Sequence, residues 1–95
     1  MALKLEWNER KNTANIRKHG FDFADAPEVF RGPMLVRLDT RKDYGEERWI
    51  GIGITYGRFV VVVYAERDNG ETVRIISMRK ALKHERKRFE ETLSN

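Results

Sequence analysis

The sequence contains no cysteine, only two prolines and only two histidines, and each scarcity narrows the chemistry. The absence of cysteine excludes disulfide bonds, thiol nucleophiles and zinc–thiolate sites, and it fits a reducing compartment. The two histidines, His19 and His84, lie far apart in the chain, which argues against a metal site. We therefore expect a protein that uses neither a metal ion nor an organic cofactor.

Long apolar runs are also lacking. No segment approaches the roughly 18 consecutive apolar residues that a membrane-spanning helix needs. The first residues, Met-Ala-Leu-Lys-Leu-Glu-Trp, do not form the apolar segment of a signal peptide. We expect a cytoplasmic protein that does not contact a membrane.

Charge is plentiful. The 95 residues include 19 Lys or Arg and 15 Asp or Glu, with a net charge of +4 and a pI near 9.6. This excess weakly favours a polyanionic partner, although the interspersed acids argue against a simple basic tail. The length predicts a single domain spanning 1–95.

The strongest local pattern is the apolar run Phe59–Val63 within Arg58–Arg67, which predicts a central strand. Turn residues flank this strand, Tyr56-Gly57 before it and Asn69-Gly70 after it, so it is shared by two hairpins. The further strands that we expect are Leu3–Trp7, Met34–Leu38, Trp49–Thr55 and Thr72–Arg79.

Helices are expected on either side of these strands. Asn8 is a good N-cap and Gly20 a natural stop, and the helix between them is polar, with Ala14 and Ile16 as its chief apolar residues. A second helix, capped by Asp22, has to be short, kinked or late because of Pro27. A charged helix over Lys80–Leu93 ends the chain, with a thin apolar stripe of Met78, Leu82, Phe89 and Leu93. The predicted fold is α+β: two N-terminal helices packed on an antiparallel meander sheet, with a C-terminal helix.

The two turns also predict the strand register. Arg48 and Arg74 are expected on either side of Ala65, roughly 10 Å apart, with Arg67 nearby and Glu46 opposite Arg67. The three arginines are expected at one end of a face that the first two helices cover. The apolar residues of this face would be Ile50, Ile52, Ile54, Phe59, Val61, Val63, Ile76 and Met78.

Three guanidiniums gathered at one end of a sheet are able to hold a phosphate group. A simpler interpretation is that each arginine is solvated or paired with a local acid such as Glu46, Glu47, Glu66 or Asp68. Simpler interpretations also exist for His19, as a helix C-terminal residue, and for Tyr64, as a packing partner of Trp49.

Several linked motifs resemble the BrnT toxins of type II toxin–antitoxin systems. They begin with Lys18-His19-Gly20 and Gly45-Glu46-Glu47-Arg48, and continue through Val61–Tyr64 to Arg74–Ser77 and Arg79–Ala81. The resemblance covers roughly Leu5 to Phe89. Two positions depart from the family pattern: Met78 replaces a more usual alanine, and Pro27 interrupts a helix.

The resemblance implies a RelE-like ribonuclease fold that cuts RNA without a metal and arrests translation. It also implies a BrnA-like antitoxin that covers the toxin. The assembly would be either a toxin homodimer or a toxin–antitoxin heterotetramer. In such chemistry a base removes the proton of the 2′-hydroxyl, an acid protonates the leaving oxygen, and cations stabilise the phosphorane.

Resemblance and register together assign candidate roles. Arg48, Arg67 and Arg74 would stabilise the phosphate, and Glu46 or Glu47 would be the base. His19 would be an acid or base if the helix end reaches this cluster. Arg79 and Lys80, at the other end of the sheet, would bind the RNA backbone or the antitoxin, and Tyr64 is an alternative stacking residue for RNA.

Two alternatives remain open at this stage. One is a non-catalytic basic module that binds RNA or protein. The other is a structural partner subunit, which is favoured if all three arginines pair with local acids.

Overall fold

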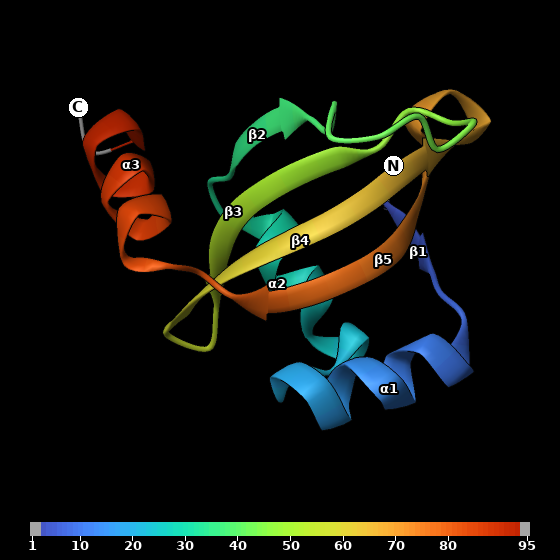
Figure 1. Cartoon of the computed structure of the whole chain (residues 1–95), viewed down its shortest axis with the longest axis horizontal. Coiled ribbons are helices and arrows are strands. Elements are labelled where there is room, and N and C mark those ends of the chain that lie inside the picture. Colours follow the sequence, from blue (N-terminus) through green and yellow to red (C-terminus); the bar gives the residue numbers. More distant parts are fainter. Residues whose placement is uncertain (1–2, 94–95) are drawn as a thin grey trace.

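The computed structural model describes residues 3–93, which form three α-helices and one sheet of five strands (Figure 1). The strands are β1 (Lys4–Glu6), β2 (Leu35–Leu38), β3 (Trp49–Thr55), β4 (Arg58–Arg67) and β5 (Thr72–Lys80). The helices are α1 (Glu9–His19), α2 (Ala26–Arg31) and α3 (Lys83–Leu93), and 3₁₀ turns span Phe23–Asp25 and Asp68–Gly70. The single-domain prediction also includes residues 1–2 and 94–95, which lie outside the described residues.

The strand order is β1-β5-β4-β3-β2. The antiparallel meander is confirmed for β2 to β5, and β1 adds a parallel strand at the β5 edge. Tyr56 and Gly57, with φ of 46° and 78°, form the predicted two-residue turn between Thr55 and Arg58. The next connection is longer than predicted, because a 3₁₀ turn separates the paired residues Arg67 and Thr72.

A β-bulge in β5 changes which residues share a face. Ala65 pairs with Arg74 as predicted, but the register shifts between Val63 and Tyr64, so Val61 pairs with Arg79 and not with Met78. One extra residue sends every later side chain to the opposite face. The prediction that Met78 joins the Ile50 face is therefore wrong, and Arg79 takes its place there.

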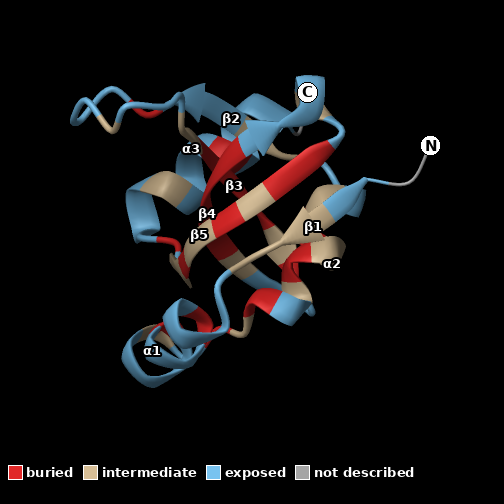
Figure 2. Cartoon of the chain, turned by 90° about the vertical axis from the view of Figure 1, so that its right-hand side faces the viewer, coloured by how far each residue is buried: buried red, intermediate tan, exposed pale blue. Residues whose placement is uncertain are grey.

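The sheet carries an apolar core on each face (Figure 2). On one face Phe23, Ala26 and Val29 pack against Val60 and Val62. On the other face Phe89 of α3 packs over a second cluster, whose buried strand residues are Ile50, Ile52, Val61 and Val63. The first two helices thus cover the opposite face from the one predicted.

Glycine explains why α2 lies where it does. Gly53 faces α2, and a Cβ atom at this position would lie only 2.7 Å from Cγ1 of Val29. A larger side chain at position 53 would push the helix away. The face lined by Gly51 and Gly53 is therefore the one on which a helix approaches the sheet most closely.

Helix α1 has the predicted ends but docks through polar residues. The Asn8 side chain accepts a hydrogen bond from the Lys11 backbone N–H, and Gly20 ends the helix with φ of 75°. Ala14 and Ile16 are exposed, and the buried residues are Asn12 and Asn15. This polar helix is held by side-chain hydrogen bonds to backbone groups, without an apolar stripe.

Helix α2 is short, as expected. The Asp22 side chain accepts from the Ala24 N–H and caps the 3₁₀ turn, not the α-helix itself. Pro27 then occupies the first turn of α2, where a missing backbone N–H is tolerated. Phe30 packs on the core edge-to-face with Tyr64, with a centroid distance of 5.0 Å.

Helix α3 begins at Lys83 rather than Lys80 and makes few apolar contacts. Phe89 is buried, whereas Leu82 and Leu93 are 55% and 39% exposed. Arg79 and Glu85 add a bidentate ion pair, and Glu85 Oε1 also accepts from the Leu82 N–H at 2.8 Å. Among residues 3–93, no helix is long and apolar enough to cross a membrane.

Candidate active site

Glu46 lies between two arginines that are far apart in sequence. Its Oε2 atom accepts a hydrogen bond of 3.1 Å from Arg48 Nε and a second one from Arg74 Nη2. The three side chains are between one fifth and one third exposed. They form a half-open cluster of two cations and one anion, which we call the Glu46 cluster.

The sheet brings these residues together. Arg74 pairs across the ladder with Ala65, and Arg48 immediately precedes β3 beside the same alanine. Ala65 itself is only 2% exposed, so the two arginines flank a covered position of the sheet. The predicted convergence of Arg48 and Arg74 on one face around Ala65 is therefore present in the structure.

Arg67 and Glu47 lie beside the cluster. Because β3 starts only at Trp49, Glu46 does not pair with Arg67 as predicted, and Arg67 Nη1 lies 3.3 Å from Glu6 Oε1. Glu46, Glu47 and Arg67 all line one hollow of about 400 Å³, together with Glu66 and Asp68. That hollow contains more carboxylates than cations, so it disfavours an RNA phosphate.

The electrostatics of the cluster follow from these contacts. The hydrogen bond from Arg74 lowers the pKa of Glu46, and the Arg48 hydrogen bond lowers it further, so the carboxylate stays ionised. Among the described residues, Arg74 Nε is buried without a hydrogen-bond partner. The cluster thus combines an ionised acceptor with a guanidinium donor that is not yet used.

All three predicted arginines pair with acids, Arg48 and Arg74 with Glu46 and Arg67 with Glu6. Such pairing is what the structural-subunit alternative predicts. The arginines alone therefore do not separate an enzyme from a non-enzymatic subunit.

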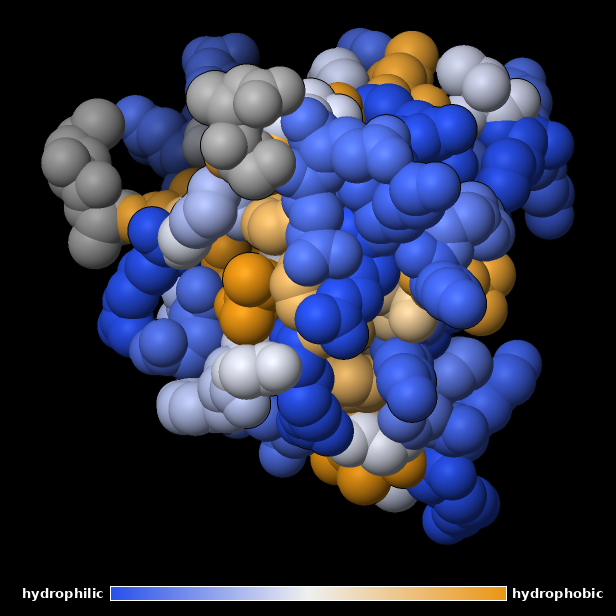
Figure 3. Space-filling view, turned by 90° about the vertical axis from the view of Figure 1, so that its left-hand side faces the viewer, coloured by the Kyte–Doolittle hydropathy of each residue, from blue (hydrophilic) through white to orange (hydrophobic). Residues whose placement is uncertain are grey.

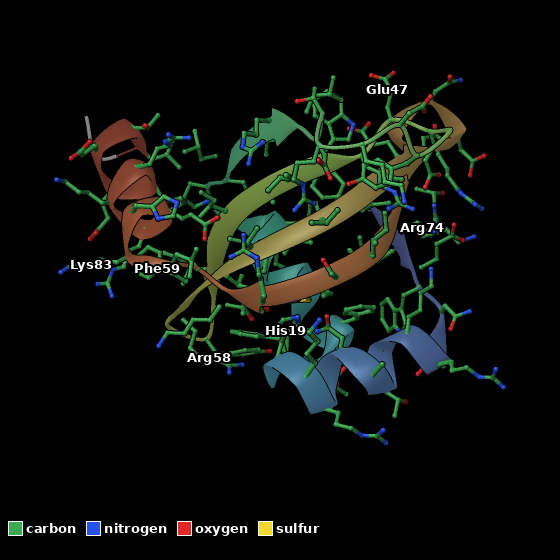
Figure 4. All side chains as sticks on the ribbon, in the orientation of Figure 1. His19, Glu47, Arg58, Phe59, Arg74 and Lys83 are labelled. Atoms are coloured by element: carbon green, nitrogen blue, oxygen red, sulfur yellow. The ribbon has the colours of Figure 1, made fainter. Side chains whose placement is uncertain are left out.

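His19 does not join the Glu46 cluster. It ends α1 and lines a separate hollow with Arg58, Lys80 and Arg86. Figure 4 shows Arg74 and Glu47 toward one end of the sheet, and Arg58 and Phe59 toward the other. The condition for a shared role, that the end of α1 reaches the arginines, is not met.

Of the remaining predicted residues, two are occupied by contacts within the protein and one is exposed. Tyr64 is only 6% exposed and packs against Phe30, so it is not available to stack on an RNA base. Arg79 is committed to Glu85. Lys80 is exposed, at the end of the sheet where the register placed it.

Sequence reasoning missed Tyr44. Its ring lies under the Arg48 guanidinium, 4.1 Å from the ring centroid, and fixes that side chain from the loop before β3. The only sequence signal was an aromatic residue in an otherwise polar loop. Within residues 3–93, no three His, Asp or Glu side chains are grouped to hold a metal ion.

Comparisons with known proteins show which family and which solved structure this chain is similar to. Residues 7–85 match the family model described as "Ribonuclease toxin, BrnT, of type II toxin-antitoxin system". The 1.1 Å crystal structure of the Brucella abortus ribonuclease toxin BrnT is similar, with a TM-score of 0.65 and 32% sequence identity. That match covers 86% of this chain and 100% of the Brucella chain. No curated protein sequence matches.

The fold and these matches define an α+β ribonuclease toxin of a type II toxin–antitoxin system. More particularly, the chain belongs to the BrnT family, because the family model covers most of its length. The family resemblance read from the sequence is confirmed.

Proposed function

We propose that this chain is a cytoplasmic, metal-independent endoribonuclease that arrests translation, acting as a single RelE-like domain over residues 1–95. The observation that carries the proposal is Glu46 held between Arg48 and Arg74. Membership of a ribonuclease toxin family supports the activity. The paired acids and arginines supply the groups that cleavage by the RNA's own 2′-hydroxyl requires.

In the proposed reaction the phosphodiester binds beside Glu46, and its oxygens take the donors of Arg48 and Arg74. Glu46, released from part of this pairing, accepts the proton of the 2′-hydroxyl as the 2′-oxygen attacks phosphorus. The bond from phosphorus to the 5′-oxygen breaks, and the 5′-oxygen takes a proton from water. The products are a 2′,3′-cyclic phosphate and a 5′-hydroxyl end.

Glu46 fits the role of base better than Glu47 does. Both glutamates line the same hollow, but Glu46 accepts hydrogen bonds from both candidate phosphate-binding arginines, whereas within residues 3–93 Glu47 forms no ion pair with an arginine. Arg67 serves as a flanking cation, and its partner Glu6 is on the neighbouring edge strand β1. Each such cation typically lowers a barrier by about 3 kcal/mol when it meets charge that develops in the transition state.

The test of the activity uses the purified chain and a defined RNA in excess EDTA. We expect cleavage to a 2′,3′-cyclic phosphate end and growth arrest when the chain is expressed alone, and we expect Arg74→Ala to relieve the arrest and to slow cleavage by roughly a hundredfold. Arg10→Ala, which removes an exposed arginine of α1 that takes no part in the Glu46 cluster, is the matched control. A wild-type chain that neither cleaves RNA nor stops growth would refute the enzyme and leave the non-catalytic binding module.

We also propose a BrnA-like antitoxin as partner, in a heterotetramer that contains two toxin chains. The support from the structure is the region of α3, where Leu82, just before the helix, and Leu93, at its end, remain exposed. Co-expression with a neighbouring gene for a ribbon-helix-helix protein tests this. Co-purification and restored growth are expected, and Leu82→Ser with Leu93→Ser should weaken both.

A further inference from the structure

A second hollow, of about 400 Å³, lies where the end of α1, the β3–β4 turn and the start of α3 meet. Four of its lining residues carry or can carry positive charge: His19, Arg58, Lys80 and Arg86. The rest of its lining is aromatic or small, and no carboxylate takes part. Figure 3 shows this side of the molecule, where hydrophilic residues surround small apolar patches.

These cations differ from those of the Glu46 cluster in having little local compensation. Within residues 3–93, neither Arg58 nor Lys80 forms an ion pair. Each carboxylate that does form one is paired with a cation other than these two. Arg86 pairs with Glu90 at 3.5 Å, but both side chains are more than half exposed. Exposed pairs of this kind contribute little and are easily exchanged. The hollow therefore keeps an uncompensated positive charge.

Two of the cations lie over aromatic rings. The Arg58 guanidinium lies 4.2 Å from the Phe21 ring centroid, and the Arg86 guanidinium lies 4.3 Å from that of Phe59. Stacking fixes each guanidinium plane while its N–H edges and its outer face stay available. Such a plane donates hydrogen bonds to a phosphate and also offers a surface on which a base can stack.

We propose that this hollow binds the phosphodiester backbone of the substrate RNA, as an anchor separate from the Glu46 cluster. The inference rests on the proposed function for its choice of RNA. Lys80 and Arg74 are six residues apart on β5, roughly 20 Å of strand, so one RNA strand can reach from one site to the other. An acidic protein segment would match the charge, but the two ring-backed guanidinium planes favour a ligand with stacking bases.

The experiment measures binding without cleavage. A fluorescent 2′-O-methyl oligonucleotide, which lacks the nucleophilic hydroxyl, is titrated with the full-length chain at several salt concentrations. The test variant is Arg58→Ala with Lys80→Ala. The matched control is Arg10→Ala with Lys11→Ala, which removes the same charge from exposed positions at the other end of α1.

We expect the test variant to bind roughly tenfold more weakly near 0.1 M salt, with a slope of log K against log[salt] shallower by about 1.4. The control should bind like wild type. Lys80→Ala alone, a change of one exposed side chain, should lower the slope by about 0.7 and serves if the double variant does not fold. Equal losses in test and control, or no loss in either, would overturn the proposal.

Two further outcomes distinguish a failure of the RNA anchor from a failure of the proposed ribonuclease function. A chain that binds the oligonucleotide through the hollow but cleaves no RNA would refute the proposed function and leave the anchor in place. If the hollow variant binds RNA normally but no longer binds an acidic antitoxin segment, the hollow is a protein-docking site and the RNA anchor is refuted.

Discussion

Arg79 at the end of β5 donates two hydrogen bonds of 2.8 Å to the carboxylate of Glu85, in the first turn of α3. The same carboxylate accepts the Leu82 N–H, so one side chain both caps the helix and ties it to the sheet. Phe89 is the only buried apolar residue of α3, so apolar packing holds the helix at a single point. We therefore expect the ion pair to fix the orientation of the helix.

The ion pair predicts an acid-sensitive stability. The Arg79 hydrogen bonds lower the pKa of Glu85 from its ordinary value of 4.5 to about 2. A lowered folded-state pKa stabilises the fold above the unfolded pKa, and this contribution is lost as pH falls from about 4.5 to about 2. We expect Glu85→Gln to lower the free energy of unfolding by about 2 kcal/mol at pH 7, and by clearly less at pH 3.

Urea unfolding at both pH values checks this. Glu28→Gln is the matched control, because the Glu28–Arg31 pair lies on the surface and such pairs contribute less than about 1 kcal/mol. An Glu85→Gln effect that is the same at pH 3 and pH 7 would contradict the ionic origin of the stabilisation.

A second prediction concerns how α1 is attached. Asn15 donates to the carbonyl oxygens of Phe21 and Met78 at 3.0 and 2.9 Å, and it accepts from the Met78 N–H at 3.2 Å. Asn15→Ala would leave these buried backbone groups without partners, at an expected cost of about 3 kcal/mol. Thermal unfolding of Asn15→Ala against Lys11→Ala, an exposed change on the same helix, measures it. Equal stability of the two variants would show that α1 is held in another way.

Much of this fold was predictable because its signals are local. The apolar run of β4 and the Tyr56-Gly57 turn predict both a strand and a hairpin, and the structure contains both. Asn8 and Gly20 mark the ends of α1 for equally local reasons. Such patterns act within a few residues, so a single sequence contains them.

The errors have non-local causes. No local signal marks the bulge in β5, so Met78 was predicted on the wrong face of the sheet. The helices were predicted to cover the apolar Ile50 face, but α2 packs on the opposite face, where Gly53 has no side chain to keep Val29 away. In the site, Arg48 and Arg74 converge as expected, but no local signal showed that His19 and Lys80 would instead meet Arg58.

The Glu46 cluster predicts the pH dependence of RNA cleavage. Hydrogen bonds from Arg74 first and Arg48 second lower the pKa of Glu46, so the acidic limb of kcat/KM should lie below the usual value for glutamate, near 4.3. Arg74→Ala should move this limb to higher pH, and Arg48→Ala should move it less. Rates are compared only where circular dichroism shows a folded chain. A limb that stays in place in both variants would exclude Glu46 as the titrating base.

The most direct measurement compares Glu46→Gln with Glu47→Gln, two neighbouring and isosteric changes of equal charge. Initial rates of cleavage of one defined RNA are measured in excess EDTA, alongside the wild type. The proposed mechanism predicts a fall in kcat of at least roughly a hundredfold for Glu46→Gln, and a rate close to wild type for Glu47→Gln. Unimpaired cleavage by Glu46→Gln, or a wild-type chain that cleaves only when a divalent metal is added, would contradict it.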